Sequence, residues 1–203
     1  MTTLTMPSSP TGFQSHRFGL RSNTLSFMSP LNGTVQTLEF PGSKWGGAYS
    51  LPPMKRVVAA AWLGFFVQLR GGAGRFYGFD PGAKTPQGVA SGAPLVDGAG
   101  QYPGNTLVTD SWPISTTGLL LPGDYFQVGD ELKMVTASVG SNGSGQATIT
   151  FEPPLRAAPV DNAAIIYTNP KCVMRLANDD QTAWDINTLN LYGITFVGIE
   201  AFV

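Results

Sequence analysis

Two Gly-Asp pairs six residues apart, in the stretch GDYFQVGDELKMV (Gly123–Val135), are the first place where this sequence suggests chemistry. Two carboxylates held at a suitable distance can serve glycoside hydrolysis as acid and as base or nucleophile. Gly and Asp are also the residues that turns prefer, because Gly accepts a positive φ and Asp bonds to nearby backbone N–H groups. The pairing of the flanking strands decides between these interpretations.

A two-residue loop at Gly129-Asp130 would pair Val128 with Glu131 and Phe126 with Lys133. Each face of the hairpin would then mix apolar and charged side chains. Since a one-residue slip exchanges the faces of a strand, the alternation of side chains identifies the better register.

A three-residue loop, Gly129-Asp130-Glu131, pairs Val128 with Leu132 and Phe126 with Met134, which leaves one face wholly apolar. We therefore predict this register, with Asp130 and Glu131 at an exposed tip. The acidic pair is interpreted as turn residues and not as a site, and the spacing of the other acids favours no second pair.

The chain has one histidine, His16, and one cysteine, Cys172, and neither is a good candidate for catalysis. A Ser-His-Asp or Cys-His arrangement would have to use His16, which lies in a start that we expect to be mobile, without a nucleophile-elbow motif. Cys172 alternates with Val173 in an expected strand, which is typical of a buried, inert thiol. A zinc site would need carboxylates for most of its ligands.

Two other motifs have simpler structural explanations. The run Arg70-Gly71-Gly72-Ala73-Gly74-Arg75 resembles a phosphate loop faintly, but it lacks the Gly-Lys-Ser/Thr ending and follows a helix instead of preceding one. Asn178, Asp179, Asp180 and Asp185 do not match the spacing of the twelve-residue calcium loop, and turns between strands explain them as well. We expect no enzyme activity, no cofactor and no metal.

Composition favours many short strands. Charged residues are only 12% of the 203 residues, whereas there are 25 Gly and 16 Pro. A net charge of −1 argues against a dedicated nucleic-acid binder, which is normally basic. The charge is unevenly divided, with seven basic and one acidic residue in 1–75 and five basic and twelve acidic residues in 76–203. Such a division can guide head-to-tail association of identical subunits, although both sets can also mingle on one solvated surface.

Neither a signal peptide nor a membrane span is expected. Met1–Pro10 has no basic start and no apolar core, and the longest apolar run, Val57–Val67, is too short to span a bilayer. The single Cys172 excludes an intramolecular disulfide framework. We expect a loose arm over Met1–Thr11 and synthesis in a reducing cytosol.

One helix is expected over about 53–69. Pro53 suits the first helical turn, and Gly71-Gly72 ends the helix. An apolar stripe at helical spacing should pack on the core; it consists of Val57, Val58, Ala61, Trp62, Phe65, Phe66 and Leu69.

The remaining periodic segments are expected to be strands, with a loop around Trp45 and another from Asp80 to Pro113. Leu191–Val203 has apolar residues on both faces and should be covered on both sides. The other expected strands are Thr24–Met28, Thr34–Phe40, Arg75–Phe79, the hairpin above, Gln146–Phe151, Ala163–Thr168 and Lys171–Ala177. The fold class is therefore mainly β with one flanking α-helix.

Five segments, taken in order, resemble the distal tail proteins of long-tailed bacteriophages and prophages. They are Gln36–Trp45 (QTLEFPGSKW), Leu69–Phe76 (LRGGAGRF), Gly123–Gly129 (GDYFQVG), Ile149–Arg156 (ITFEPPLR) and Gly198–Phe202 (GIEAF). The resemblance runs from about residue 12 to the end of the sequence.

This resemblance implies a tail-tube-like β-sandwich over 1–84 and 160–203 and a smaller inserted β subdomain over 85–159 on the outside of a ring. It implies six copies at the distal end of the virion tail, made in the cytoplasm of the bacterial host. The partners would be other copies, the tail tube protein and tail-tip or hub proteins. DNA would pass only through the channel, and no membrane insertion is expected. The family supplies no catalytic residues.

Two other functions stay open at this point. The chain can be another ring of the same tail, such as a tube subunit or a tail-completion protein. Alternatively, it can be a carbohydrate-binding module for host attachment that stacks Tyr102, Trp112 and Tyr125 on sugar.

A channel that releases DNA should be poor in Lys and Arg. We expect its charge to come mainly from the acidic part after residue 76, while Arg17, Arg21, Arg70 and Arg75 turn toward neighbouring subunits. Glu200 stands among apolar residues in the last strand. It must meet an Arg or lie at an interface or lumen edge, because an unpaired buried carboxylate is costly.

Overall fold

Frequent Gly and Pro residues divide the chain into short segments, and most of these segments form strands. The computed structural model describes residues 2–10 and 12–202. Strands make up 37% of the chain and helix 10%, and the part described contains one α-helix. The predicted mainly β fold with a single helix is confirmed.

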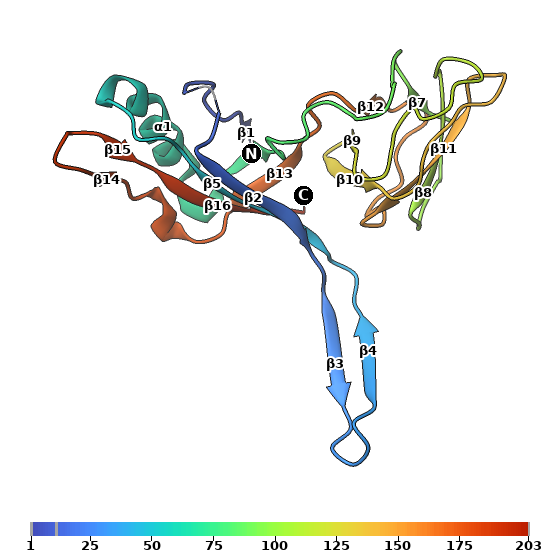
Figure 1. Ribbon diagram of the computed structural model, residues 1–203, viewed down its shortest axis with the longest axis horizontal. Helices are drawn as coiled ribbons and strands as arrows, with labels where there is room; N and C mark the ends of the chain where they lie inside the picture. Colours follow the sequence, from blue (N-terminus) through green and yellow to red (C-terminus); the bar gives the residue numbers. More distant parts are fainter. Residues whose placement is uncertain (1, 11, 203) are drawn as a thin grey trace.

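The first sheet has six strands in the order β1-β6-β13-β16-β5-β2 (Figure 1). Neighbouring strands are antiparallel, except for the parallel pair β1 and β6. The strands are β1 (Thr3–Leu4), β2 (Ser15–Arg21), β5 (Lys44–Ser50), β6 (Arg75–Gly78), β13 (Cys172–Leu176) and β16 (Thr195–Glu200).

One face of this sheet is a buried aromatic layer. Tyr49, Phe76 and Phe196 lie on it and are at most 1% exposed, and the rings of Tyr49 and Phe196 stack at 5.1 Å. A Cβ atom at Gly198 would lie 2.8 Å from the Phe76 ring, so this glycine lets the ring lie flat on the strand. The opposite face carries Val197 and Ile199, which are half-buried. The expectation of a last strand covered on both sides therefore holds fully for one side only.

Helix α1 (Arg56–Leu69) covers the aromatic layer, as predicted. Trp62 and Phe66 place their rings 5.8 and 5.2 Å from the ring of Phe196. The helix begins after Pro53, because Lys55 is extended (φ −69°, ψ 155°), and it ends where Arg70 adopts the left-handed conformation. The residue that ends it is therefore Arg70, one position before the predicted glycines.

Part of the predicted apolar stripe was wrong. Val57 is 89% exposed and Ala61 is also exposed, whereas Ala59 is buried together with Trp62, Phe65, Phe66 and Leu69. At about 100° per residue, Ala61 lies about 100° and Val57 about 140° around the helix from Trp62. Both point away from the sheet, so the buried stripe is narrower than the sequence pattern suggested.

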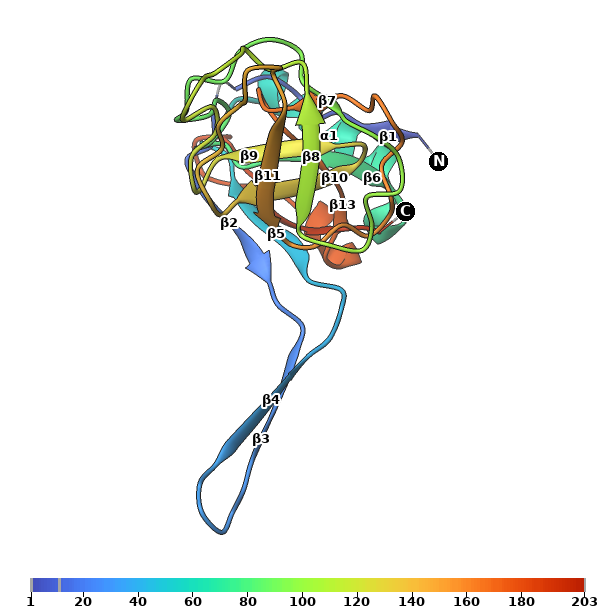
Figure 2. The same cartoon turned by 90° about the vertical axis from the view of Figure 1, so that its right-hand side faces the viewer.

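A second six-stranded sheet follows the order β12-β9-β10-β11-β8-β7 (Figure 2). A bridge between Leu95 and Ala164 joins its two edges, and the hydrogen bonds Val96 N–H to Ala163 O and Ile165 N–H to Pro94 O close it into a small barrel. The strands are β7 (Leu95–Val96), β8 (Thr106–Asp110), β9 (Tyr125–Val128), β10 (Glu131–Val135), β11 (Ala147–Glu152) and β12 (Ile165–Ile166).

The barrel encloses a second core. Ala147, Ile149 and Phe151 point into it from β11, on one face as expected, and Phe126 and Leu107 meet them there. Strands β7 and β8 lie in the stretch from Asp80 to Pro113 that we expected to be loop. Thr109 points inward and bonds its Oγ1 to Ala147 O at 2.8 Å, and this polar interior position interrupts the apolar alternation.

The predicted register of the β9–β10 hairpin was wrong. Val128 pairs with Glu131 and Phe126 with Lys133, so the loop is the two-residue turn Gly129-Asp130, with Gly129 at φ 57°. The register tolerates mixed faces because both faces of the hairpin are covered, one by the barrel core and the other by the first sheet. Glu131 is consequently not at an exposed tip but at the start of β10.

Two loop expectations also need correction. The stretch around Trp45 is β5, a central strand, and the start of the chain is attached to the body. Residues 3–4 form β1, Met6 is 8% exposed, and Trp62 Nε1 donates to Ser9 O at 2.7 Å. The structure does not describe Met1 and Thr11, which belong to the N-terminal segment that we predicted to be loose.

The remaining elements are small, apart from a long hairpin described below. Within the part of the chain that the structure describes, no helix has the length and apolar character needed to cross a membrane. The short elements are η1 (Gly71–Ala73), η2 (Asp179–Thr182) and the two-stranded sheet of β14 (Asp185–Ile186) and β15 (Tyr192–Gly193).

Replacing Trp62 or Phe66 with Ala should lower the free energy of unfolding by about 3–5 kcal/mol, because each change leaves a large cavity between α1 and the sheet. Urea denaturation of the full chain measures the loss. Val57→Ala on the same helix is the matched control and should change it by less than about 0.5 kcal/mol. Trp62→Ala behaving like Val57→Ala would contradict this assignment of the helix face.

Candidate functional site

A two-stranded hairpin extends far from the body of the protein (Figures 1 and 2). It consists of β3 (Thr24–Met28) and β4 (Val35–Glu39), joined by the turn residues 29–34, and we call it the arm. It continues the edge strand β2 outward and returns into β5. All ten strand residues are exposed, so the arm packs on no other described part of the chain.

The two faces of the arm differ in chemistry. Leu25 pairs with Leu38 and Phe27 with Gln36, so one face carries three large apolar side chains that are 57–64% exposed. The opposite face pairs Thr24 with Glu39 and Ser26 with Thr37, whose hydroxyls lie 3.3 Å apart. Next to the turn this opposite face also becomes apolar, because Met28 pairs with Val35 and both are at least 60% exposed. Leu31 in the turn itself is 96% exposed. An amphipathic arm of this kind has one face suited to cover by another protein.

A buried ion pair joins the two sheets. Glu200 at the end of β16 is 1% exposed, and its Oε1 accepts a 2.6 Å hydrogen bond from Nη2 of Arg156 in the barrel. Its Oε2 accepts the backbone N–H of Trp45 at 2.9 Å, and Trp45 Nε1 donates to Leu132 O at 2.7 Å. The Arg156 guanidinium also lies 4.1 Å from the centre of the Phe202 ring. Glu200 thus meets an Arg, which is the first of the positions expected for it.

Glu131 and Lys133 extend this network within the barrel. The fully buried Nζ of Lys133 lies 2.6 Å from Glu131 Oε2 and donates to Pro154 O at 2.8 Å. Burial lowers the pKa of Lys133, and the hydrogen bond to Glu131 opposes that shift. Glu131 in turn accepts the backbone N–H groups of Arg156 and Ala157 at 3.1–3.3 Å. The network holds the segment that carries Arg156 in position for Glu200. We call these residues, Glu131, Lys133, Arg156 and Glu200, the joint.

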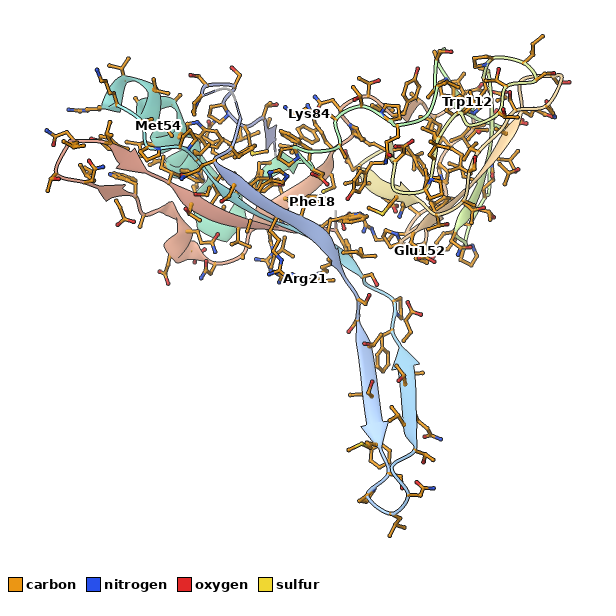
Figure 3. All side chains as sticks on the ribbon, viewed as in Figure 1. Phe18, Arg21, Met54, Lys84, Trp112 and Glu152 are labelled. Carbon is orange, nitrogen blue, oxygen red and sulfur yellow. The ribbon has the colours of Figure 1, made fainter. Side chains whose placement is uncertain are left out.

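The four arginines expected to face neighbours lie at two places. Arg17 and Arg21 are exposed on β2, on the face of the first sheet opposite the aromatic layer; Figure 3 shows Arg21 pointing away from Phe18. Arg70 ends α1, and Arg75 Nη1 lies 3.0–3.3 Å from the carbonyl oxygens of residues 72–74. The sequence run that resembled a phosphate loop is therefore a helix terminus closed by its own arginine.

The two residues considered for catalysis, His16 and Cys172, lie in strands of the first sheet. His16 lies in β2 and not in a mobile start; its Nε2 is 3.6 Å from Asp80 Oδ1, and Asp80 Oδ2 is 3.3 Å from the hydroxyl of Tyr125. Cys172 is fully buried, and burial raises the pKa of its thiol well above the usual value. A thiol held protonated in this way is a poor nucleophile.

The acidic residues singled out in the sequence organise turns. Asp124 is 3% exposed and its carboxylate accepts the backbone N–H groups of Gln87, Gly88 and Leu121 at 2.7–3.2 Å. Asp179 accepts the N–H of Gly72 at 2.8 Å. Among residues 2–10 and 12–202, no group of three or more His, Cys, Asp or Glu side chains is placed to hold a metal ion.

The three aromatic residues considered for sugar stacking do not share a surface. Trp112 and Tyr125 are 3% and 6% exposed, and Tyr125 packs on Trp45 at 5.4 Å. Tyr102 is 51% exposed and lies alone of the three in a hollow of about 620 Å³ between the root of the arm and the barrel. Phe40 and Phe202 line the same hollow.

Sequence reasoning found the arm strands, and it expected Glu200 to meet an Arg or to lie at an interface or lumen edge. It found neither the exposure of the arm nor the identity of the Arg. The exposed arm had one visible signal, the alternation of Leu25, Phe27 and Leu38 with Thr and Ser, which also fits a half-buried strand. Arg156 is 44 positions from Glu200, and nothing in the sequence pairs them. Comparison with models of known protein families and with curated proteins gave no match.

Arg156→Met should lower the free energy of unfolding by about 3–5 kcal/mol, because it leaves the carboxylate of Glu200 buried without a cation. Glu200→Gln should cost less, about 1–2 kcal/mol, since Arg156 is 25% exposed and can turn to water. Urea denaturation measures both, with Arg56→Met on α1 as the exposed control. Equal losses for Arg156→Met and Arg56→Met would show that the joint does not hold the sheets together.

Stability should fall as the pH rises above about 10, because burial raises the pKa of both Tyr49 and Tyr125 above the usual value of 10.0. The unfolded chain loses these phenol protons where the folded chain keeps them, so the free energy of unfolding decreases with pH. Lys133 has the opposite sign, since its lowered pKa leaves the unfolded chain with the extra proton up to pH about 10.5.

Tyr49→Phe removes one phenol and leaves Lys133 in place. Its stability should therefore fall less steeply between pH 10 and 11.5, by about 1.4 kcal/mol per pH unit. Denaturation curves at four pH values give the slope of unfolding free energy against pH for the parent and for the variant. Identical slopes would exclude Tyr49 as a source of the pH dependence.

Proposed function

We propose that the protein is a structural, non-enzymatic subunit of a bacteriophage tail, which assembles with other copies into a ring at the distal end of the tail. The ring joins the tail tube to the tail tip and leaves a channel for DNA. The observation that carries the proposal is the arm, an amphipathic hairpin whose strand residues are all exposed in the described part of the subunit.

An arm of this kind needs cover. A two-stranded hairpin alone is marginally stable in water, and this one exposes Leu25, Phe27 and Leu38 on one face. Burying three such side chains against a neighbour contributes roughly 5–8 kcal/mol before the entropy of association is subtracted. A surface that projects from one subunit and fits a different surface on the next makes a heterologous contact, and such contacts form a ring when the rotation between subunits closes.

The resemblance to distal tail proteins supplies the rest of the proposal: six copies, and contacts with the tail tube protein and with tail-tip proteins. It places the mature protein in the virion. The arm overlaps the first of the segments that carry the resemblance, since Gln36–Trp45 (QTLEFPGSKW) runs from β4 into β5. A tube subunit or a tail-completion protein would use the same kind of arm, and the number of stacked rings in the tail separates these possibilities.

Leu25→Ser, Phe27→Ser and Leu38→Ser together should abolish ring formation while leaving the fold intact, because these side chains contribute to neither core. The matched control is the triple variant Thr24→Ala, Ser26→Ala and Thr37→Ala on the opposite face, which should assemble like the parent. Light scattering and electron microscopy of the full-length protein, alone and with its tail neighbours, report the assembly.

In tails, cryo-electron microscopy should show six copies with each arm lying on the next subunit. A single peripheral copy would overturn the proposal. So would unimpaired ring formation by the Ser variant.

A further inference from the structure

The face of the first sheet opposite the aromatic layer carries only one kind of charge. Along β2 and β5 its side chains include Arg17, Arg21 and Lys44, and β13 adds Arg175. Among the six strands of the first sheet as the structure describes them, the one acidic residue is Glu200, and it points to the other face. We call this surface, with Gly19, Ala48, Val197 and Ile199 between the charges, the basic face.

The basic face is hollowed beside the root of the arm. A hollow of about 310 Å³ is lined by Arg17, Arg21, Gly19, Gly46 and Val197, among others. A Cβ atom at Gly46 would lie 3.0 Å from Arg21 Nε, so the arginine side chain lies over the glycine. Figure 3 shows Arg21 on the side from which the arm projects.

Arg17 and Arg21 have no carboxylate within 4.0 Å among the residues that the structure describes. They are exposed, and they differ from Arg75, whose guanidinium is occupied by backbone carbonyls. Two free guanidinium groups on either side of a hollow suit a partner with carboxylates, since Arg forms bidentate bonds with them.

The outer wall of the barrel has the opposite character. Asp97 lies directly after β7 and Asp110 at the end of β8. Among the described residues, their carboxylates accept side-chain hydrogen bonds from Gln146 and Ser111, which are neutral. The sequence from 85 to 132 contains no Lys or Arg. We call the surface of Asp97 and Asp110 the acidic wall; Glu152 lies at the opposite end of the β8–β11 pair, in the hollow at the root of the arm. Strands β8 and β11 lie on the side of the barrel away from the first sheet (Figure 1).

The acidic wall and the basic face do not meet within one subunit, because β7 and β8 lie on the side of the barrel away from β2 and β5 (Figures 1 and 2). We infer that the basic face of one copy receives the acidic wall of the next. The inference rests on the proposed function for its partner, a second copy, and adds to it the surfaces that fix which way the subunits follow one another. Complementary potentials of this kind set the register of an interface.

A second copy suits these surfaces better than DNA does. The basic face has the half-buried side chains of Ala48, Val197 and Ile199 between its charges, and the wall offers Val108, which is 40% exposed. Such mixed surfaces are typical of protein interfaces. DNA would meet phosphate repulsion from the wall of the same chain, whose net charge is −1.

The test is reversal of charge on each surface of the full-length protein. Arg17→Glu with Arg21→Glu, and separately Asp97→Lys with Asp110→Lys, should each weaken self-association about tenfold or more in sedimentation velocity at 50 mM salt. An equimolar mixture of the two variants should recover association. When the two variants alternate, every contact joins a basic surface to an acidic one, either as in the parent or with both charges reversed. High salt, about 0.5 M, should weaken the parent in the same way.

Lys55→Glu with Arg56→Glu is the control, since these cations lie at the start of α1 and outside both surfaces. All substituted residues are at the surface, and thermal melting verifies that each variant is folded. Association that is unchanged by either reversal, or not recovered on mixing, would overturn the inference. A parent that remains monomeric at low salt and high concentration would also overturn it.

The arm variants separate this inference from the proposed function. If the Ser variant of the arm fails to assemble but the charge variants assemble normally, the ring stands and the charged contact is wrong. If each tail contains a single copy of the protein, the proposal of a ring is wrong. Retarded migration of a DNA duplex with the parent, lost in the Arg17→Glu and Arg21→Glu variant, would reassign the basic face to nucleic acid.

Discussion

The buried carboxylate of Glu200 has to be neutralised, and among the described residues the cation that pairs with it, Arg156, comes from the barrel. Glu200 is 1% exposed, and a buried charge without a partner costs several kcal/mol. Arg156 satisfies it at 2.6 Å, but only when the barrel lies against the end of the first sheet. The ion pair and the apolar contacts of Tyr125 and Leu132 with the first sheet therefore depend on the same relative position of the two sheets.

The β9–β10 hairpin shows how this arrangement changes local rules. A hairpin with one solvent-exposed face would place its apolar residues on one face and its charged residues on the other. Both faces of this hairpin are covered, and each contributes side chains to a different core. Tyr125 and Leu132 pack on the first sheet, Phe126 and Val135 fill the barrel, and Lys133 is buried because Glu131 and the Pro154 carbonyl neutralise and solvate its ammonium group. The same hairpin therefore supplies the turn Gly129-Asp130, two residues of the joint and parts of two cores.

The surfaces left over are consistent with the low charge of the chain. The joint uses four of its charged side chains, the turn of Asp124 uses a fifth, and the arm carries one. On the outside, Arg17, Arg21 and Lys44 gather on the basic face beside the arm, and Asp97 and Asp110 gather on the acidic wall of the barrel. A monomer gains nothing from this segregation, whereas a subunit that must always meet its neighbour in one orientation gains specificity from it.

Several features of the protein followed from the sequence alone, because they depend on local periodicity and on turn chemistry. Trp62, Phe66 and Leu69 are spaced for one face of a helix, Ala147, Ile149 and Phe151 for one face of a strand, and Cys172 for a buried position, and each lies where its spacing indicated. The arm strands also appeared within a residue of their bounds.

Tertiary structure alone decided what those elements meet. The register of the β9–β10 hairpin depended on a second core that no local pattern reveals, and Val57 faced water because the sheet lies on another side of the helix. The alternation of Leu25, Phe27 and Leu38 with polar residues could not indicate that this face of the arm lies exposed instead of packing on a sheet. The apolar surroundings of Glu200 predicted that it would meet an Arg or lie at an interface or lumen edge. Which Arg it meets depended on how two distant segments come together. Local sequence patterns do not indicate which charges pair at long sequence separation.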